Sequence, residues 1–476
     1  MKTLLNPCSY GSQKVVDVLV KPLVSPKSVS QEKEGLMSDM KEAKLVIHGQ
    51  HPLNGRIRVS GAKNSVLKLM AAALISEEET IIRNVPALTD VSVMAKVLNS
   101  LGRQVEIIGD QCVIQAGGIT QTEAPYTLVS QMRASFNVLG ALVGRYRTAK
   151  VPLPGGCSIG KRGVDIHIKG LQALGVEIHV EHGIVYAEAP QLKGGHFTLD
   201  MPSVGATENV LLASVLATGT TVLSNVAQEP EIQDLVGFLN AMGCKIDGAG
   251  SSELVIEGVQ ASDLKPVDYT VMPDRIECAS FMACVLSSGG DVLVEQARPR
   301  HMTAVLTKFR EMGAYVEVVG DSAFRVIRKP AQRLKSTDVM TNFYPGFPTD
   351  LQSPMMALMS QADGVSMMSE TIYENRFKHV GELNRMGANI QVKGDVAIVN
   401  GVACLSGASV KSHDLRAGMA MVIAGLGAEG YSSIYHLRHL DRGYECLHEK
   451  LLAIGAHIKR VPLSETEAEQ LLDTLY

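Results

Sequence analysis

Tryptophan is absent from the 476 residues of this chain, and aromatic residues make up only 4% of it. Platforms on which nucleic-acid bases stack need aromatic side chains, so the composition argues against a nucleic-acid partner. The net charge of −4 points the same way, because it gives no general basic field that could attract a phosphate backbone. We therefore expect no nucleic acid among the partners of this protein.

Long hydrophobic runs are missing as well. A membrane-spanning helix needs about 18 apolar residues in a row. The best candidate, from Met419 to Leu426, is short and is interrupted by Gly425. No membrane partner is expected, and the shares of hydrophobic residues (46%) and charged residues (20%) are those of an ordinary globular protein.

The eight cysteines form no C-x-x-C pair, which excludes the usual spacing of a zinc site. His436 and His439 are three residues apart, but they lie in a stretch with strand character and are interpreted as structural. Most cysteines occur in apolar stretches, a pattern that suits a reducing compartment. These features predict a cytoplasmic protein without a metal site.

What the chain does contain is a repeat. An amphipathic helix ends in an apolar residue and a glycine, and a stretch that alternates like a β-strand follows. A glycine in this place lets the chain leave the helix through a left-handed turn. The glycines recur every 68 to 74 residues, at Gly102, Gly175, Gly243, Gly313, Gly387 and Gly455.

Each unit also has an earlier half, so its predicted order is helix–strand–helix–strand–strand. Six units exceed a single hydrophobic core, which stops growing near roughly 250–300 residues. The economical packing is an α/β (α+β) protein with three units in each of two pseudo-symmetric domains. Residues 1–43 show no such period and are expected to be a flexible extension. An organelle transit peptide is the alternative, although Asp17, Glu32 and Glu34 argue against it.

Charged residues occur at or near the starts of most of the first helices, and most of them are cations. A cation is unfavourable there, because a helix N-terminus is already positive, unless an anion is bound. Backbone N–H groups and cations together bind phosphate or carboxylate groups. A strongly anionic ligand is therefore one interpretation, and a set of solvated surface charges is the other. The residues are Lys63, Arg133, Arg275, Asp350 and Arg416.

Cys157 lies in a glycine-rich stretch that is followed by Lys161 and Arg162. Nearby cations lower the pKa of a thiol and make it reactive, and a glycine-rich loop can act as a lid. An ordinary loop cysteine fits the spacing equally well.

Asp350 follows Pro348 and Thr349 at a predicted helix start. It is either a general base among cationic helix starts or a carboxylate that complements the helix dipole. Arg442 also has two interpretations: it binds an anion, or it forms an ion pair with Asp441.

Nine stretches together resemble the UDP-N-acetylglucosamine 1-carboxyvinyltransferase family, in order and spacing, from about Lys44 to about Arg460. They are Ser60-Gly61-Ala62-Lys63-Asn64, Met132-Arg133-Ala134-Ser135, Pro154-Gly155-Gly156-Cys157, Ser203-Val204-Gly205-Ala206-Thr207, Pro273-Asp274-Arg275-Ile276-Glu277, Phe347-Pro348-Thr349-Asp350, Glu374-Asn375-Arg376-Phe377, Asp414-Leu415-Arg416-Ala417 and Asp441-Arg442-Gly443-Tyr444-Glu445.

The resemblance implies two inverse α/β barrel-like domains, with residues 63–272 in the first and residues 44–62 and 273–476 in the second. It implies transfer of the enolpyruvyl group of phosphoenolpyruvate to the 3-hydroxyl of UDP-N-acetylglucosamine, with release of phosphate. This is a cytoplasmic step of peptidoglycan synthesis, and it needs no metal or organic cofactor because phosphate is a good leaving group.

The resemblance also assigns roles. Cys157 is the acid that protonates the methylene carbon, and it can form a pyruvate adduct; Asp350 is the base for the sugar hydroxyl. Phosphoenolpyruvate binding falls to Lys63, Asn64, Arg162, Arg416 and Arg442. Binding of the UDP-sugar falls to Arg133, Arg162, Gly163, Val164, Asp165, Ile166, Ser203, Val204, Gly205, Asp350 and Ile372.

The chain departs from the family pattern in three places. Gly163 stands where proline is usual, Met201-Pro202 stands where lysine or tyrosine is common near the diphosphate, and residues 1–43 have no usual counterpart. The rival hypotheses are 3-phosphoshikimate 1-carboxyvinyltransferase activity and a catalytically silent UDP-sugar-binding paralogue. Retention of Cys157, Asp350 and the cations together argues against the silent paralogue.

Overall fold

The computed structural model describes residues 43–155, 163–329, 332–464 and 466–467, and six small β-sheets are found among them. Each sheet belongs to one repeated unit, in which two helices alternate with the strands. The first helices are α2 (Lys63–Ala72), α5 (Val138–Tyr146), α7 (Val204–Ser214), α9 (Arg275–Ser288), α11 (Gln352–Met359) and α13 (Leu415–Gly427). The second helices are α3 (Thr89–Leu101), α6 (Asp165–Ala173), α8 (Pro230–Met242), α10 (Thr303–Glu311), α12 (Val380–Arg385) and α14 (Leu447–Ala453).

Three sheets come from the first half of the chain. They are β13–β3–β5–β4 (Val267–Thr270, Thr80–Arg83, Gln111–Ile114, Val105–Ile108), β6–β8–β7 (Thr148–Pro152, Ile184–Glu188, Glu177–Glu181) and β11–β12–β10–β9 (Lys245–Asp247, Glu253–Glu257, Thr220–Ser224, His196–Thr198). In each sheet an antiparallel hairpin follows the second helix, as the alternating pattern predicts.

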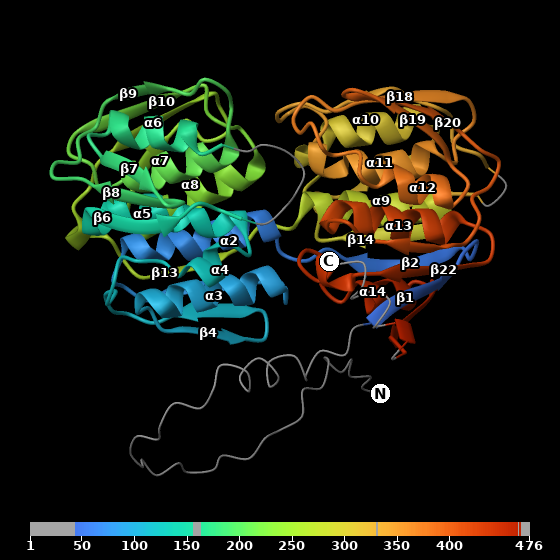
Figure 1. Ribbon diagram of the computed structural model, residues 1–476, viewed down its shortest axis with the longest axis horizontal. Helices are drawn as coiled ribbons and strands as arrows, with labels where there is room; N and C mark the ends of the chain where they lie inside the picture. The colour runs from blue at the N-terminus through green and yellow to red at the C-terminus, as the bar shows by residue number, and fades with distance from the viewer. Residues whose placement is uncertain (1–42, 156–162, 330–331, 465, 468–476) are drawn as a thin grey trace, which may run out of the picture. The chain divides into compact units, whose positions relative to one another are not determined.

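The other three sheets combine the second half of the chain with its first two strands. They are β15–β16–β14–β2 (Tyr315–Val319, Ala323–Arg328, Gly290–Glu295, Leu53–Arg58), β17–β18–β20–β19 (Val339–Met340, Val365–Ser369, Val396–Asn400, Asn389–Lys393) and β21–β22–β1–β23 (Ser409–Lys411, Tyr431–Tyr435, Ala43–His48, His457–Pro462). In Figure 1 the blue strands β1 and β2 accordingly lie among yellow-to-red elements. Strand β1 completes the sixth unit, which otherwise lacks the partner strand of its hairpin.

The repeated glycines have the conformation that the pattern predicts. Gly102, Gly175, Gly243, Gly313, Gly387 and Gly455 all have positive φ angles, between 84° and 110°. The final helix begins at Leu447, because Cys446 before it is left-handed, with a φ of 45°. The stretch from Leu437 to His439 is a short 3-10 helix and not a strand.

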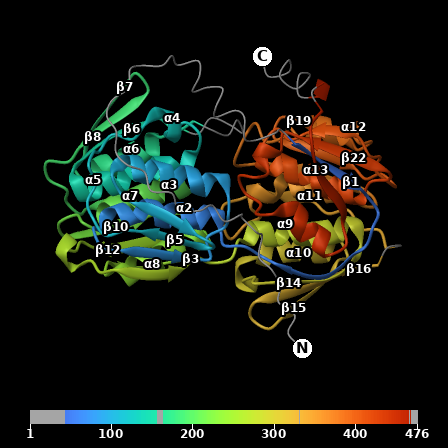
Figure 2. The ribbon, with the colours of Figure 1, turned by 90° about the horizontal axis from the view of Figure 1, so that it is seen from below.

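The buried hydrophobic residues form two separate clusters. One extends from Ala62 to Met272, and the other combines residues between Leu45 and Val59 with residues between Ile276 and Ile458. The first helices pack against one another inside each cluster; Figure 2 shows α9, α11 and α13 together. A helix that is buried on all sides needs apolar or small residues around its whole circumference.

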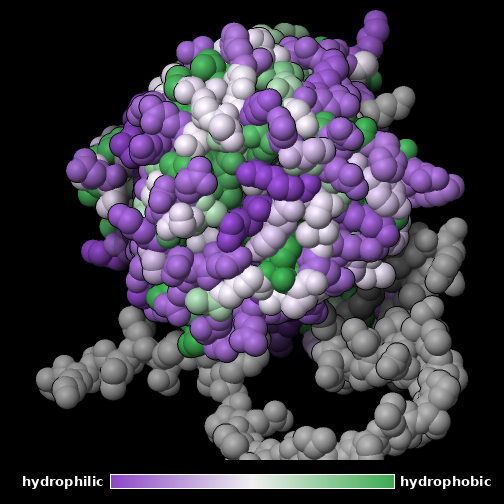
Figure 3. Space-filling model, turned by 90° about the vertical axis from the view of Figure 1, so that its left-hand side faces the viewer, coloured by the Kyte–Doolittle hydropathy of each residue, from purple (hydrophilic) through white to green (hydrophobic). Residues whose placement is uncertain are grey.

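Small residues also allow close helix packing. A Cβ atom on Gly140 of α5 would lie only 2.1 Å from the backbone oxygen of Asn209 in α7, so only glycine fits there. The surface in Figure 3 shows hydrophobic side chains in small patches between hydrophilic ones. None of the helices that the structure describes is both long enough and apolar enough to cross a membrane.

Two adjacent connections join the clusters. Ala62 donates its backbone N–H to the oxygen of Met272 (2.7 Å), and Asp274 donates to the oxygen of Ser60 (2.9 Å). Helices α2 and α9 start immediately after these connections, at Lys63 and Arg275. The start of α2, from one hydrophobic cluster, therefore lies beside the start of α9, from the other. The domain limits given in the sequence analysis stay a prediction.

Candidate active site

Asp90 connects the two clusters electrostatically. It lies in the first turn of α3, and its carboxylate contacts Lys63 Nζ (2.8 Å) at the start of α2 and Arg442 Nε (2.8 Å) from the segment before α14. Only 3% of the Asp90 side chain is exposed. A buried carboxylate therefore bridges one cation from each cluster.

The environment keeps Asp90 ionised. Burial by itself would raise the pKa of its carboxyl group, but Lys63 and Arg442 together lower that pKa below its ordinary value. Burial lowers the pKa of Lys63 against the attraction of Asp90, and the neighbouring charges of Arg416 and Arg442 lower it further. The three cations are thus close enough to influence one another.

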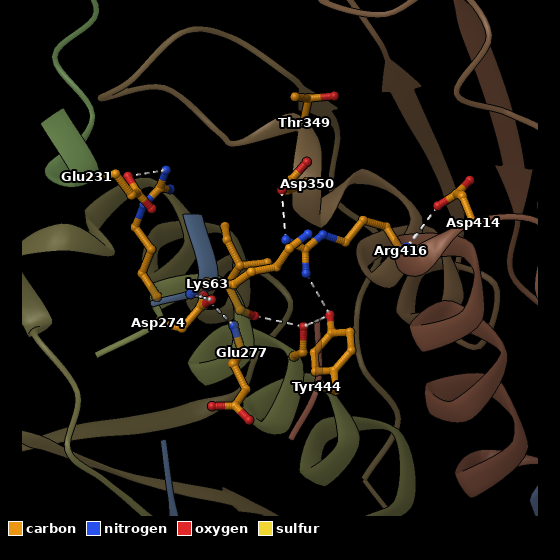
Figure 4. Close-up of polar contacts among 12 residues, drawn as sticks. Lys63, Glu231, Asp274, Glu277, Thr349, Asp350, Asp414, Arg416 and Tyr444 are labelled. Atoms are coloured by element: carbon orange, nitrogen blue, oxygen red, sulfur yellow. Dashed lines mark hydrogen bonds and ion pairs between the residues drawn. The ribbon is translucent and has the colours of Figure 1, made fainter. Parts of the chain in front are cut away.

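Asp350 is the second carboxylate that bridges two cations. It lies in the 3-10 helix η5 (Thr349–Leu351) before α11, and its oxygens accept hydrogen bonds from Arg376 Nη2 (2.7 Å) and Arg416 Nη2 (2.8 Å). Figure 4 shows Arg416 between Asp350 and Tyr444, to whose hydroxyl it also donates (3.2 Å). Burial acts to raise the pKa of Asp350, and the two guanidinium groups outweigh it and lower that pKa far below its usual range.

Two further aspartates cap helices that begin at the site. Asp414 accepts the backbone N–H groups of Arg416 (2.8 Å) and Ala417 (3.0 Å) and so caps α13. Asp274 caps α9 in the same way through the N–H groups of Ile276 (2.8 Å) and Glu277 (3.0 Å). It also accepts the backbone N–H of Lys63 (3.2 Å), which ties α2 to α9.

The anions expected at the cationic helix starts are carboxylates of the protein itself. Lys63 pairs with Asp90, and Arg416 pairs with Asp350. Arg275 contacts Glu231 (3.1 Å) at the start of α8. An anionic ligand at these positions has to compete with internal ion pairs.

A search against protein-family models matches residues 47–451 to the family described as EPSP synthase (3-phosphoshikimate 1-carboxyvinyltransferase). This chain belongs to the EPSP synthase family of enolpyruvyl transferases.

Its curated relatives identify the branch of that family. The chain is 49% identical over 418 residues to UDP-N-acetylglucosamine 1-carboxyvinyltransferase 2 of Carboxydothermus hydrogenoformans, covering 88% of this chain and 99% of the relative. It is 50% identical over 422 residues to UDP-N-acetylglucosamine 1-carboxyvinyltransferase of Gluconacetobacter diazotrophicus, with coverage of 88% and 99%. The resemblance seen in the sequence is therefore confirmed, and it is favoured over the 3-phosphoshikimate alternative.

Solved structures agree on the fold. The enolpyruvyl transferase NikO from Streptomyces tendae superimposes with a TM-score of 0.80 at 25% identity, covering 89% of this chain and 100% of NikO. EPSP synthase from Acinetobacter baumannii gives a TM-score of 0.66 at 19% identity, with coverage of 88% and 99%. The predicted fold class, two barrel-like α/β domains of three units each, is confirmed.

Four of the residues predicted for phosphoenolpyruvate binding and catalysis take part in the ion pairs of Asp90 and Asp350. They are Lys63, Arg416, Arg442 and Asp350 itself. Asn64 follows Lys63 in the first turn of α2 and is partly buried. Cys157 and Arg162 lie outside the described residues.

The residues predicted for the UDP-sugar lie mainly at two helix starts. Gly163 and Val164 lead into α6, whose first residues are Asp165 and Ile166. Ser203 caps α7, whose first residues are Val204 and Gly205.

The two helix starts are in contact with each other. A Cβ atom on Gly205 would lie 3.1 Å from the ring of His167 in α6. His167 is buried, which lowers its pKa to about 3, with further lowering from Arg133 and Lys68. Arg133 is thereby also placed near the two helix starts.

Ile372 approaches the site through Glu370. The Glu370 carboxylate accepts the backbone N–H of Ile372 (2.9 Å) and the hydroxyl of Thr349 (2.9 Å), the residue before Asp350.

Asp90 and Arg376 are not among the site residues that the sequence predicts. An acidic residue in the first turn of a helix is normally explained by the helix dipole, so Asp90 gave no separate signal. Arg376 lies in one of the family stretches, and its burial (3% exposed side chain) distinguishes it from a surface arginine only once the structure is known.

Proposed function

We propose that this chain transfers the enolpyruvyl group of phosphoenolpyruvate to the 3-hydroxyl of UDP-N-acetylglucosamine and releases phosphate. The observation that supports this most directly is that Lys63 and Arg442, which share Asp90, lie within electrostatic reach of Arg416, which pairs with Asp350. These charged residues occur in a chain that is 49% and 50% identical to two relatives named UDP-N-acetylglucosamine 1-carboxyvinyltransferase.

Phosphoenolpyruvate has a phosphate and a carboxylate. These two anionic groups suit the cations around Asp90 and the cations around Asp350. The phosphate binds to Lys63, Arg442 and Arg162, in competition with Asp90, and Asn64 lies beside it. The substrate carboxylate pairs with Arg416 and displaces Asp350 from one of its two guanidinium partners. The pKa of Asp350 then rises toward the range in which a carboxylate is a useful base.

Catalysis follows an addition and an elimination. Cys157 gives a proton to the methylene carbon, so that C2 becomes electrophilic. The 3-oxygen of the sugar bonds to C2 while Asp350 takes its proton. A proton then leaves the new methyl group and phosphate leaves C2, which restores the double bond in the product. No metal or organic cofactor is needed for these steps.

The UDP-sugar binds along the starts of α6 and α7. Backbone N–H groups at helix starts favour anionic groups such as a diphosphate, and Arg133 adds positive charge nearby. The residues proposed for it are Arg133, Arg162, Gly163, Val164, Asp165, Ile166, Ser203, Val204, Gly205, Asp350 and Ile372.

We also propose residues 63–272 as the first domain, residues 44–62 and 273–476 as the second, and residues 1–43 as an extension. The two hydrophobic clusters support this division. The enzyme acts in the cytoplasm on soluble metabolites. Its product enters peptidoglycan synthesis and thereby serves the cell wall, cell shape and division.

A coupled phosphate-release assay tests the proposal with phosphoenolpyruvate and two alternative acceptors. Phosphate release with UDP-N-acetylglucosamine and none with shikimate 3-phosphate is expected. Release only with shikimate 3-phosphate would replace the proposed acceptor, and release with neither would favour a silent UDP-sugar binder.

The role of Cys157 has its own test. An electrophilic epoxide should alkylate the wild-type chain at Cys157, and Cys157→Ser should abolish labelling at that site. Labelling of another residue in the wild type would remove Cys157 as the reactive thiol.

A further inference from the structure

Three histidines gather where the first and last strands of the described chain meet, and none of them is among the residues assigned above. His48 ends β1, His457 begins β23, and these two residues are paired directly across the strands. His51 follows in the connection to β2, and its Nε2 atom lies 2.9 Å from Nδ1 of His48. One ring nitrogen from each histidine lies within 4.8 Å of the other two. No other group of three potential metal ligands occurs among the described residues.

Aromatic and aliphatic side chains lie against this histidine cluster. The ring of His48 stacks on Tyr431 from β22 (4.4 Å between ring centres), and His51 stacks on His457 (3.5 Å). A hollow of about 450 Å³ lies beside His48 and His457 and is lined also by Val46, Leu452 and Lys459. A neutral imidazole nitrogen with a free lone pair can bind a metal ion.

The donor set selects the kind of ion. Imidazole suits zinc, copper and nickel, whereas magnesium and calcium require oxygen ligands. Zinc binds histidine nitrogen at roughly 2.0–2.1 Å, so two nitrogens on one tetrahedral ion lie about 3.3–3.4 Å apart. The 2.9 Å between His51 Nε2 and His48 Nδ1 is close to this value, and all three nitrogens lie within 4.8 Å of one another. His457 is exposed enough for its ring to turn toward the ion.

We propose that His48, His51 and His457 form a binding site for a divalent transition-metal ion, best fitted by Zn²⁺. A water molecule in the neighbouring hollow supplies the fourth ligand. The bound ion connects the first strand of the folded chain to the last, so its role is to fasten β1 and β23 together. This site is independent of the proposed transferase activity.

The test measures zinc affinity of the full chain after treatment with a chelator, by competition with a chromogenic zinc chelator. His48→Gln, His51→Gln and His457→Gln are each expected to weaken binding at one site by at least about 100-fold. The matched control His182→Gln changes a histidine in an exposed turn (88% exposed side chain) and should leave binding unchanged. Thermal unfolding without metal checks that each variant is folded.

Cobalt(II) as a spectroscopic probe identifies the ligands. Wild-type protein should give the visible absorption of a four-coordinate Co²⁺ site without thiolate charge-transfer bands, and the triple histidine variant should lose it. Three results would overturn the proposal: no wild-type zinc binding below about 1 mM, equal zinc affinity in the histidine variants, or a thiolate signature. None of these results depends on enzyme activity.

Discussion

Asp90 and Asp350 are both carboxylates that contact two cations, but they differ in where those cations come from. The partners of Asp90 belong to different hydrophobic clusters, since Lys63 starts α2 and Arg442 precedes α14, 352 residues away from Asp90. Both partners of Asp350 belong to its own cluster. Asp90 therefore links the two halves of the molecule, whereas Asp350 is oriented within one half.

Exposure separates the two sites as well. The Asp350 side chain is 27% exposed and that of Asp90 only 3%. A base must reach the substrate hydroxyl, which Asp350 can do and Asp90 cannot. The same arrangement of one acid and two cations thus orients the proposed base at Asp350 and attaches the two hydrophobic clusters to each other at Asp90.

The largest expected effect tests the linking role. Asp90→Asn leaves Lys63 and Arg442 close together without a counter-charge, and loss of one member of a buried ion pair costs about 3–5 kcal/mol. We expect the free energy of unfolding in urea to fall by that amount. Inorganic phosphate should restore stability more in this variant than in the wild type, because it supplies the missing negative charge.

The matched control for this variant is Asp268→Asn, which breaks an ion pair with Arg83 that is 41–49% exposed. Exposed pairs contribute at most about 1 kcal/mol. Equal losses in the two variants, or no selective effect of phosphate, would contradict the linking role of Asp90.

The second prediction concerns Asp350, the proposed base. Asp350→Asn removes the proposed base but keeps its shape, so turnover should fall by roughly 100-fold or more. Binding of UDP-N-acetylglucosamine, followed by calorimetry, should stay nearly intact. Asp363→Asn serves as control, because Asp363 pairs with Arg333 and is 73% exposed. Wild-type turnover in the Asp350 variant would remove this residue from the mechanism.

The sequence predicted the parts of the structure that depend on local signals. The six helix-ending glycines and the unit order follow from backbone conformation and hydrophobic period, and both are confirmed. The pairing of β1 with β22 and β23 has no local signal, because it joins the start of the folded chain to its end.

The candidate site shows the same limit. Cations at helix starts were recognised, but the carboxylates that neutralise them come from distant segments, as Asp90 and Arg442 illustrate. Pair partners of this kind are fixed by tertiary packing alone.

A third acid sharpens the comparison, because among the described residues no pair of cations contacts it. Glu229 precedes α8, and one of its carboxylate oxygens is buried without a hydrogen-bond partner in the part of the chain that the structure describes; burial raises its pKa to about 7. Its folded form binds a proton more tightly than the unfolded chain does. Its stabilising contribution is therefore present below about pH 4.5 and is lost as the pH rises to about 7.

The third prediction follows from that sign. Between pH 4.5 and 7, the wild type should lose at most about 3 kcal/mol of stability relative to Glu229→Gln, measured by urea unfolding at several pH values. Asp90 and Asp350 have the opposite sign, since their lowered pKa values remove stability only as the pH falls below about 4. Glu257→Gln, at an exposed position, should run parallel to the wild type. A parallel profile for Glu229→Gln would contradict the prediction.

The smallest expected effect separates charge from geometry at Asp350. Arg376 donates to Asp350 Oδ1 (2.7 Å) and to Thr349 Oγ1 (2.9 Å) through two nitrogens, and the single ammonium of a lysine cannot reproduce that planar fork. Arg376→Lys keeps the positive charge, so Asp350 stays ionised, but its orientation is less precise. We expect turnover to fall about tenfold, with KM for UDP-N-acetylglucosamine changed less than about twofold, in steady-state kinetics. Arg385→Lys, at an arginine that is 63% exposed, should leave both constants unchanged. Full turnover in Arg376→Lys would mean that Arg416 alone orients the base, and the two-cation arrangement would then matter for attachment at Asp90 but not for catalysis at Asp350.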